Sequence, residues 1–272
     1  MKLQKLFTKD FYTKDTNLFT ILTVLLPIHV FGIAALFNLS ATVLWTLLAG
    51  YVLISGFGIA VCYHRYYSHK AFVTSKWIQV VITYFGVLAG QGSPIFWASV
   101  HRGYHHPFSD TEKDLHSPVA HSWFTAYIGW ILFFVPKKFK VRAVGDMLKD
   151  PIVLFFHNHY YKILWSTWII AALISWPFFL GLCLAQMYAF HQENLVDLFC
   201  HIKSPILGVS YRNYETKDKS VNVFPFGYFS WGQAWHNNHH GKPADYDFGK
   251  TWWEFDPAKV LVWMIKRKPK LG

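Results

Sequence analysis

The stretch TNLFTILTVLLPIHVFGIAALFNLSATVLWTLLAGYVLISGFGIAVCYH, residues 16–64, decides the fold because its 49 residues include no Asp, Glu, Lys or Arg. A membrane-spanning helix needs about 20 mainly apolar residues. The run is therefore long enough for two spans, about 16–38 and 41–63, joined by a tight turn near Asn38–Ser40.

A second uncharged run covers 30 residues, Ile163–Gln192, and predicts two further spans, about 161–180 and 182–201, with a break near Pro177 and Gly181. The whole chain of 272 residues is 53% hydrophobic and only 15% charged, where about a quarter is usual. Buried helices of a soluble protein are the alternative, which two uncharged runs of this length disfavour. The sequence thus predicts a protein that is solvated partly by lipid.

The positions of Lys and Arg predict how the chain is oriented in the membrane. The tail 1–15 carries four lysines, whereas the turn at 38–40 carries no charge. Positive residues favour the cytoplasmic side, so both termini and the basic segments 137–142 and 266–270 are expected there. The net charge of +11 fits this rule and attraction to anionic headgroups. No basic, aromatic-interleaved module for nucleic acid is apparent.

Eight of the fifteen histidines lie in three short stretches, HRYYSH (64–69), HRGYHH (101–106) and WHNNHHG (235–241). All three fall on the predicted cytoplasmic side. Neutral imidazole is the commonest protein ligand for transition metals. Eight imidazoles are too many for one ion, so the clusters predict a two-metal site. On an ideal helix His101 and His105 share a face, with His106 about 100° further round, and His64 and His69 differ by about 140°.

A ninth ligand is expected at the end of the last span. In HQENLVDLFCH (191–201), Glu193, Asp197 and His201 recur every four residues on one helix face. Ionisable groups at membrane depth indicate function by default, although a solvated stripe is the alternative. No thiolate arrangement favours zinc or an iron–sulfur cluster. Imidazole suits Fe, Cu or Zn, and a site beside lipid favours oxygen chemistry, and therefore iron.

The ordered set H-x4-H, H-x3-H-H and H-x2-H-H resembles the membrane fatty acid desaturases, most closely the acyl-CoA Δ9-desaturase branch of bacteria and animals. FSDTEKDLHSP (108–118) and YRNYETKDKSVN (211–222) are similar too, and the resemblance runs from about residue 20 to 265. It implies a single all-α integral membrane domain, 1–272. Four transmembrane helices would carry a cytoplasmic helical cap, 64–160 and 202–272, with interfacial helices near 77–100 and 122–135.

The resemblance also implies two iron ions and O2 as co-substrate. Two hydrogens leave a saturated acyl chain, a cis double bond forms, and O2 is reduced to water. No catalytic residue beyond the metal ligands is expected. Asp197 stands where the family usually has an Asn that touches one iron through water. Matched one by one, the nine ligands are His64, His69, His101, His105, His106, His201, His236, His239 and His240.

Acidic side chains after the second cluster are candidates to orient the ligands by accepting their free N–H groups. Asp110 and Asp114 are expected in this role, with a solvated loop acid as the alternative. Glu112 and His116 are equally well explained as ordinary loop residues.

Substrate contacts are expected at two further places. Gln91 and Trp97 match positions that shape the acyl channel in animal stearoyl-CoA desaturases, with core or interfacial packing as the alternative for Trp97. Arg65, Arg102 and the basic run 137–142 could contact an anionic headgroup such as the CoA phosphates.

The expected partners are a fatty acyl-CoA or another acyl carrier, membrane lipids and an electron donor such as ferredoxin or cytochrome b5 with its reductase. The chain ends soon after the third cluster, so we expect the donor to be a separate protein. The compactness of this chain favours a bacterial inner-membrane enzyme. A membrane di-iron hydroxylase of alkyl or lipid chains is the alternative enzyme. A metal transporter would need ligands at mid-membrane depth.

Overall fold

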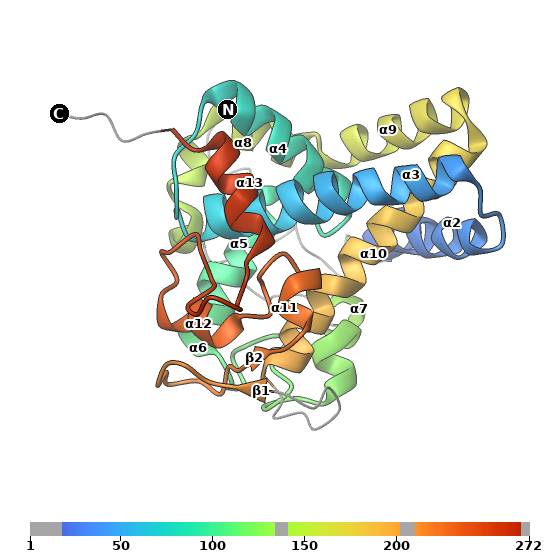
Figure 1. Ribbon diagram of the computed structural model, residues 1–272. Helices are drawn as coiled ribbons and strands as arrows, with labels where there is room; N and C mark the ends of the chain where they lie inside the picture. Colours follow the sequence, from blue (N-terminus) through green and yellow to red (C-terminus); the bar gives the residue numbers. More distant parts are fainter. Residues whose placement is uncertain (1–17, 134–140, 202–209, 268–272) are drawn as a thin grey trace.

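The computed structural model describes residues 18–133, 141–201 and 210–267 (Figure 1). The lysine-rich tail, the segment 137–140 of the first basic run and residues 268–270 of the second lie outside the described residues. The predicted orientation and the headgroup contact of 137–140 therefore stay predictions.

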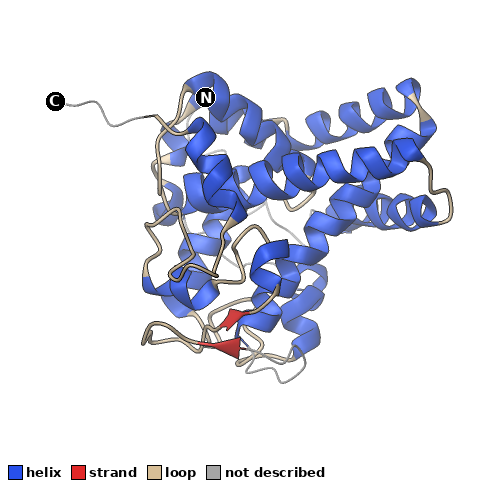
Figure 2. Cartoon of the chain, in the orientation of Figure 1, coloured by secondary structure: helices blue, strands red, loops and turns tan. Residues whose placement is uncertain are grey.

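The described chain is mostly helical, with one small antiparallel sheet in which Ser210 pairs with Val223 and Tyr211 with Asn222 (Figure 2). The elements are η2 (Ile21–Leu25), α2 (Leu26–Leu36), α3 (Ala41–Gly50), η3 (Tyr51–Ser68), α4 (Lys76–Leu88), α5 (Pro94–Val100), η4 (His101–His105), α6 (His106–Phe108), η5 (Thr125–Gly129), α7 (Trp130–Phe133), η6 (Val141–Val144), η7 (Met147–Lys149), α8 (Pro151–Asn158), α9 (Tyr160–Ile174), α10 (Trp176–His201), β1 (Ser210–Tyr211), β2 (Asn222–Val223), α11 (Phe226–Phe229), α12 (His236–Gly241) and α13 (Pro257–Ile265).

The first two predicted spans form long apolar helices. Leu18–Leu36 and Ala41–Ser68 are, within the described chain, the two helices long and apolar enough to cross a membrane. Ser40 begins the second, because its side chain accepts a hydrogen bond from the Val43 N–H. The second helix continues through His64, so the first histidine cluster lies on the last turn of a candidate span.

The third and fourth predicted helices are α9 and α10, and the break between them lies at Ser175, two residues before Pro177 and well before Gly181. Pro177 lies in the first turn of α10, where a missing N–H costs nothing. Gly181 lies where α10 crosses α3, and a Cβ there would be 2.7 Å from the Thr46 Cβ. The glycine thus serves close helix packing and not a turn.

Helices α2, α3 and α9 and the beginning of α10 project together from the rest of the molecule (Figure 1). Their outer faces are apolar, and Leu173 is 81% exposed. An apolar surface of this extent marks a face that meets lipid or another protein. Other exposed large apolar residues of these helices are Leu26, Ile33, Leu36, Leu44, Trp45, Leu48, Ile169, Ile170 and Ile174.

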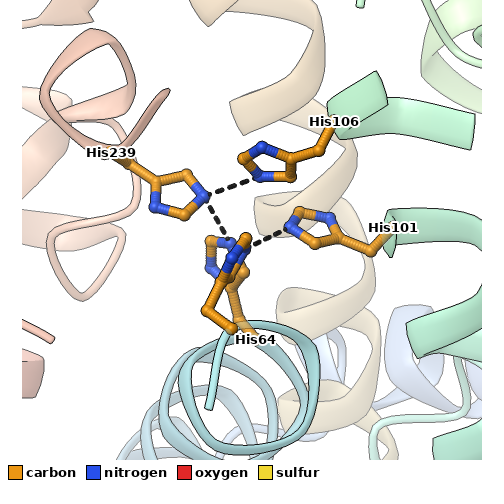
Figure 3. Close-up of side chains that lie close together, drawn as sticks. His64, His101, His106 and His239 are labelled. Carbon is orange, nitrogen blue, oxygen red and sulfur yellow. Dashed lines mark hydrogen bonds between the residues drawn. The ribbon is translucent and has the colours of Figure 1, made fainter. Parts of the chain in front are cut away.

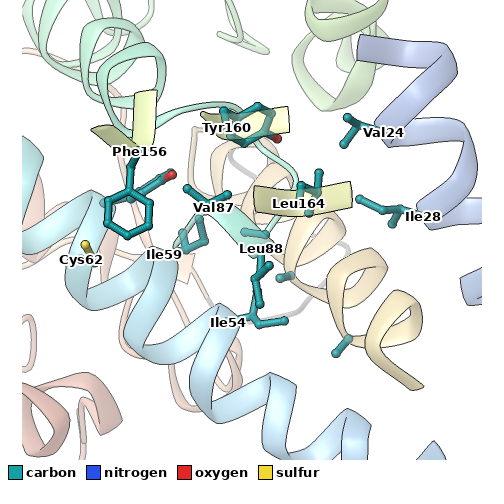
Figure 4. Close-up of a cluster of buried hydrophobic side chains, with 14 of the residues drawn as sticks. Val24, Ile28, Ile54, Ile59, Cys62, Val87, Leu88, Phe156, Tyr160 and Leu164 are labelled. Carbon is teal, nitrogen blue, oxygen red and sulfur yellow. The ribbon is translucent and has the colours of Figure 1, made fainter. Parts of the chain in front are cut away.

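A buried apolar cluster joins the projecting helices to the remainder, which carries α5, α6 and α12 (Figure 4). It receives Ile28 from α2, Ile59 from η3, Val87 from α4 and Leu164 from α9, all at most 1% exposed. The expected interfacial helix 77–100 is two helices, α4 and α5, with a turn between them. This core fixes the end of η3 against α5, which brings the first two histidine clusters together.

Candidate metal centre

Nine histidines from four distant parts of the chain converge into two groups. In each group every residue offers one ligand atom, and these atoms lie within 4.8 Å of one another. The five-histidine group is His64, His69, His101, His106 and His239; the four-histidine group is His105, His201, His236 and His240. The structure therefore brings together all nine residues that the sequence suggested as ligands.

Figure 3 shows four rings of the five-histidine group pointing toward one another. The Nε2 atoms of His64 and His239 are 3.0 Å apart, and those of His106 and His239 are 2.9 Å apart. In the other group the Nε2 atoms of His201 and His236 are 3.1 Å apart. A neutral imidazole whose Nδ1 donates has only a lone pair on Nε2. Several Nε2 lone pairs facing one point are stabilised by a shared cation.

Two buried nitrogens give independent support for bound metal. Among the described residues, Nε2 of His105 and Nε2 of His240 have no hydrogen-bond partner. A buried polar atom is nearly always paired, and both belong to the four-histidine group. The all-imidazole donor set and these orphaned atoms fit transition-metal ions.

The winding of two helices decides which histidine joins which group. Tyr51–Ser68 and His101–His105 are π-helical, with i→i+5 hydrogen bonds such as His69 N–H to His64 O at 3.1 Å. The wider π-helical turn brings residues five apart closer to one face than an ideal α-helix does. His101 and His106 belong to the five-histidine group, whereas His105 belongs to the other. The sequence placed His101 and His105 on one helix face but did not assign either residue to an ion.

Carboxylates accept hydrogen bonds from the Nδ1 atoms of rings in the four-histidine group. Nδ1 of His105 donates to Asp114 at 3.1 Å, and Nδ1 of His201 donates to Asp110 at 3.1 Å. Such contacts fix the tautomer and aim Nε2 inward. Asp110 and Asp114 thus contact histidines in the manner expected of partners of metal ligands. Glu112 is exposed, in agreement with a solvated loop acid.

Two polar contacts were missed by the sequence analysis. Asp218 accepts from Nδ1 of His240 at 2.8 Å, and Gln233 accepts from Nδ1 of His64 at 2.6 Å. Gln233 also donates to Glu193 at 2.5 Å, which links η3 to α10. Asp218 lies in a polar segment with several similar residues, so its spacing carries no signal. Gln233 is recognisable only by its place three residues before His236.

Asp197 and His116 lie beside the four-histidine group. His116 is buried, its Nδ1 is 3.4 Å from Asp114 and 3.8 Å from Asp197, and its ring lies 4.9 Å from that of His105. His116 is therefore part of this polar cluster and not an exposed loop histidine. The contact of Asp197 with an ion stays a prediction.

Burial sets the protonation of the ligands outside the spans. It lowers the pKa of His69 to about 3, with neighbouring histidines and arginines adding to the shift. For Asp218, burial acts to raise the pKa, but hydrogen bonds from His240 and Ser220 outweigh it, so the pKa lies well below its usual value. Burial, followed by neighbouring imidazoles, also lowers the pKa well below its usual value in His101, His105, His106, His236 and His239. These rings are neutral, as metal ligation requires.

The two expected channel residues lie together next to the five-histidine group. The indole N–H of Trp97 donates to Gln91 Oε1 at 3.1 Å, and the Gln91 amide donates to the Ala189 carbonyl at 3.0 Å. The Trp97 ring stacks on His101 at 4.9 Å. Their position suits contact with a substrate near the metals, while the channel itself stays a prediction.

The buried position of Arg65 disfavours the predicted contact with a headgroup. Its side chain is 0% exposed and forms a 2.8 Å salt bridge with Asp256, which is also fully buried. Arg102 is 13% exposed, and its three guanidinium nitrogens all donate within the protein, including to Asp146 at 2.7 Å. The N–H donors of both arginines bind acceptors of the protein itself. The two side chains therefore stabilise the histidine clusters in which they lie.

Comparison with known proteins agrees with this site. Residues 17–265 match the family model described as "Fatty acid desaturase". The chain is 29% identical over 260 residues to an acyl-CoA 5-desaturase of Anemone leveillei, covering 93% of this chain and 77% of the relative. It is 32% identical to a delta-9 acyl-lipid desaturase of Arabidopsis thaliana, covering 86% and 75%. It is 34% identical to an sn-1 stearoyl-lipid 9-desaturase of Synechocystis sp., covering 82% and 67%.

Proposed function

Since the chain belongs to the fatty acid desaturase family and is a fatty acyl desaturase, we propose that it uses two iron ions and O2. It inserts a cis double bond into a saturated acyl chain, and its electrons come from a separate donor protein such as ferredoxin or cytochrome b5. The observation that carries this proposal is the convergence of nine imidazoles, six of them in buried residues, into groups of five and four.

Bound iron would supply the oxidising chemistry with O2, and the protein supplies position and environment. The nine histidines offer neutral nitrogens, so the protein adds no negative charge through these ligands. Asp110, Asp114 and Asp218 hold the N–H protons at Nδ1 of their partner rings and fix where Nε2 points. Burial of the rings excludes water from the site.

The substrate is a fatty acyl group, because the relatives are acyl-CoA and acyl-lipid desaturases by name. We propose insertion at Δ9 of an acyl-CoA, with Gln91 and Trp97 along the acyl channel. An acyl lipid is the second candidate, favoured by the names of two of the relatives. A narrow apolar channel would hold one methylene pair beside the metals.

We further propose one domain, residues 1–272, with four membrane crossings and cytoplasmic termini. The two candidate spans and the apolar outer faces of α2, α3 and α9 support this arrangement. The histidine clusters then lie at the cytoplasmic ends of the helices, in the cap formed by 64–160 and 202–272. A bacterial inner membrane is the proposed location.

The test is expression, together with an electron donor, in a host that lacks unsaturated fatty acids. Gas chromatography with mass spectrometry should reveal a new cis alkene and its position. His239→Ala should abolish it, because His239 belongs to the five-histidine group. An alcohol in place of the alkene would favour the hydroxylase, and no new product from iron-loaded protein would contradict the proposal. Supplying acyl-CoA or phospholipid to purified protein decides between the two carriers.

A further inference from the structure

The segment after the third cluster carries a buried phenylalanine between the first and third clusters. Phe248 is 1% exposed, and its ring centroid lies 4.3 Å from that of His239 and 5.5 Å from that of His64. The Arg65 guanidinium carbon lies 3.7 Å from the same ring centroid. One aromatic ring thus touches two candidate ligands and the arginine that follows one of them.

Asp256 connects Arg65 with the backbone of Phe248. Its Oδ2 accepts from Arg65 at 2.8 Å and from the Phe248 N–H at 2.9 Å, and its Oδ1 accepts from the Ala258 N–H at 2.9 Å. Arg65 and Asp256 are both 0% exposed. A buried guanidinium needs such a partner, so Asp256 fixes Arg65, and the helix that carries His64, against Phe248.

Glu254 binds the third cluster through hydrogen bonds. Its Oε1 accepts from the Tyr211 hydroxyl at 2.5 Å and from Asn213 at 2.7 Å, and its Oε2 accepts from Asn238 at 3.1 Å. Oε2 also accepts from the N–H groups of Lys250 and Thr251. Asn238 lies in α12 immediately before His239. The carboxylate therefore ties the histidine-bearing helix to the same segment that contacts Arg65.

We propose that the side chains of Phe248, Glu254 and Asp256 form a latch that positions His64 and His239 for a metal ion. The first and third clusters are about 170 residues apart, and no hydrogen-bonded strand or shared helix joins them within the described chain. Gln233 contacts His64 directly. The latch adds a second connection, in which Asp256 contacts Arg65 of η3, Glu254 contacts Asn238 of α12, and Phe248 packs against the rings of His64 and His239. Its residues touch no ligand nitrogen, so they are positioning residues. The inference rests on the proposed metal centre and not on the substrate or the product.

The test uses the full chain in detergent, stripped of metal and titrated with Co²⁺ as a spectroscopic probe. Wild-type protein should bind two ions. In Phe248→Leu we expect the affinity for one ion to fall about 10- to 100-fold, the range for residues that support metal ligands, while the other ion is retained. Phe255→Leu is the matched control, because Phe255 lies in the same segment but is 47% exposed. It should bind both ions as the wild type does.

The proposal is overturned if folded Phe248→Leu binds both ions with wild-type affinity, or if Phe255→Leu loses an ion equally. Should Phe248→Leu fail to fold, as judged by its thermal unfolding in detergent, Glu254→Gln decides. Its amide keeps the shape but cannot accept all five hydrogen bonds, so weaker Co²⁺ binding supports the latch and unchanged binding overturns it. A wild-type protein that binds two ions but makes no alkene would contradict the proposed function and leave this test intact.

Discussion

At the residue scale, several histidines of the centre use their two nitrogens for different contacts. Nε2 points into its group, while Nδ1 donates to a protein oxygen in residues such as His64, His105 and His240. The partner differs: an amide holds His64, whereas carboxylates hold the other two. Because a carboxylate raises the basicity of its imidazole more than an amide does, the two groups are expected to bind their ions with different strengths.

Replacing Asp218 by Asn should weaken metal binding at the four-histidine group alone. The change removes the charge that holds Nδ1 of His240, and loss of such a partner typically costs about 10- to 100-fold in affinity. Metal titration of the purified protein measures this. Glu215→Gln, an exposed acid in the same segment, is the control and should have no effect. Equal weakening of both ions would contradict the assignment.

Replacing Asp256 by Asn should destabilise the protein by about 3–5 kcal/mol, because it leaves the buried Arg65 without its charged partner. Thermal unfolding in detergent measures the loss. The control is Lys259→Met, which breaks the partly exposed pair with Asp247 and should cost at most about 1 kcal/mol. A similar effect of the two substitutions would show that burial of the pair is unimportant.

At the scale of elements, helix winding and helix contact together place the ligands. The π-helical turns η3 and η4 bring residues five apart closer to one face, and the pairs His64 with His69 and His101 with His106 both belong to the five-histidine group. Helix α10 packs against α2 and α3, which fixes the height at which His201 enters the site. Small residues at the crossing, Gly50 against Ala185 and Gly181 against Thr46, allow this close approach.

Gly181→Ala should destabilise the pair of α3 and α10 by about 1–3 kcal/mol, the usual cost of overpacking. The added Cβ would lie 2.7 Å from the Thr46 Cβ and 2.9 Å from the Val43 carbonyl oxygen, and the backbone atom cannot move aside alone. Gly145→Ala is the matched control, because its Cβ would meet no atom closer than 3.9 Å. The midpoints of thermal unfolding give the comparison, and an unchanged midpoint for Gly181→Ala would refute the packing argument.

At the scale of the molecule, the apolar helices and the histidine clusters lie at opposite ends. The loop between α2 and α3 and the junction of α9 and α10 lie at the same end of the projecting helices, away from α12 (Figure 1). This arrangement supports the proposal that the apolar end lies in a membrane and the histidine clusters lie outside it.

Single cysteines should report this arrangement in intact cells. Leu39→Cys and Ser175→Cys are expected to react with a membrane-impermeant maleimide from outside, because both lie at the far end of the helices. Lys250→Cys should react only after lysis. The natural cysteines Cys62, Cys183 and Cys200 are buried and serve as an internal blank. Labelling of residues 39 and 250 from the same side would exclude the four-span topology.

The sequence by itself determined the apolar helices, the nine histidines and their family, because these depend on composition and on local spacing. Long uncharged runs predict apolar helices, and clustered imidazoles predict a site that could hold metal ions. It also pointed to Asp110 and Asp114, since both follow the second cluster closely.

The tertiary structure alone decided how the histidines divide, because each group combines side chains from distant segments, two of which are π-helical and not ideal α-helix. It also decided that Asp218, Gln233 and Phe248 contact them, since these contacts join segments far apart in the chain. Arg65 shows the same limit: a basic residue beside a cluster suggested an anionic ligand, yet folding places the carboxylate of Asp256, 191 residues away, against it.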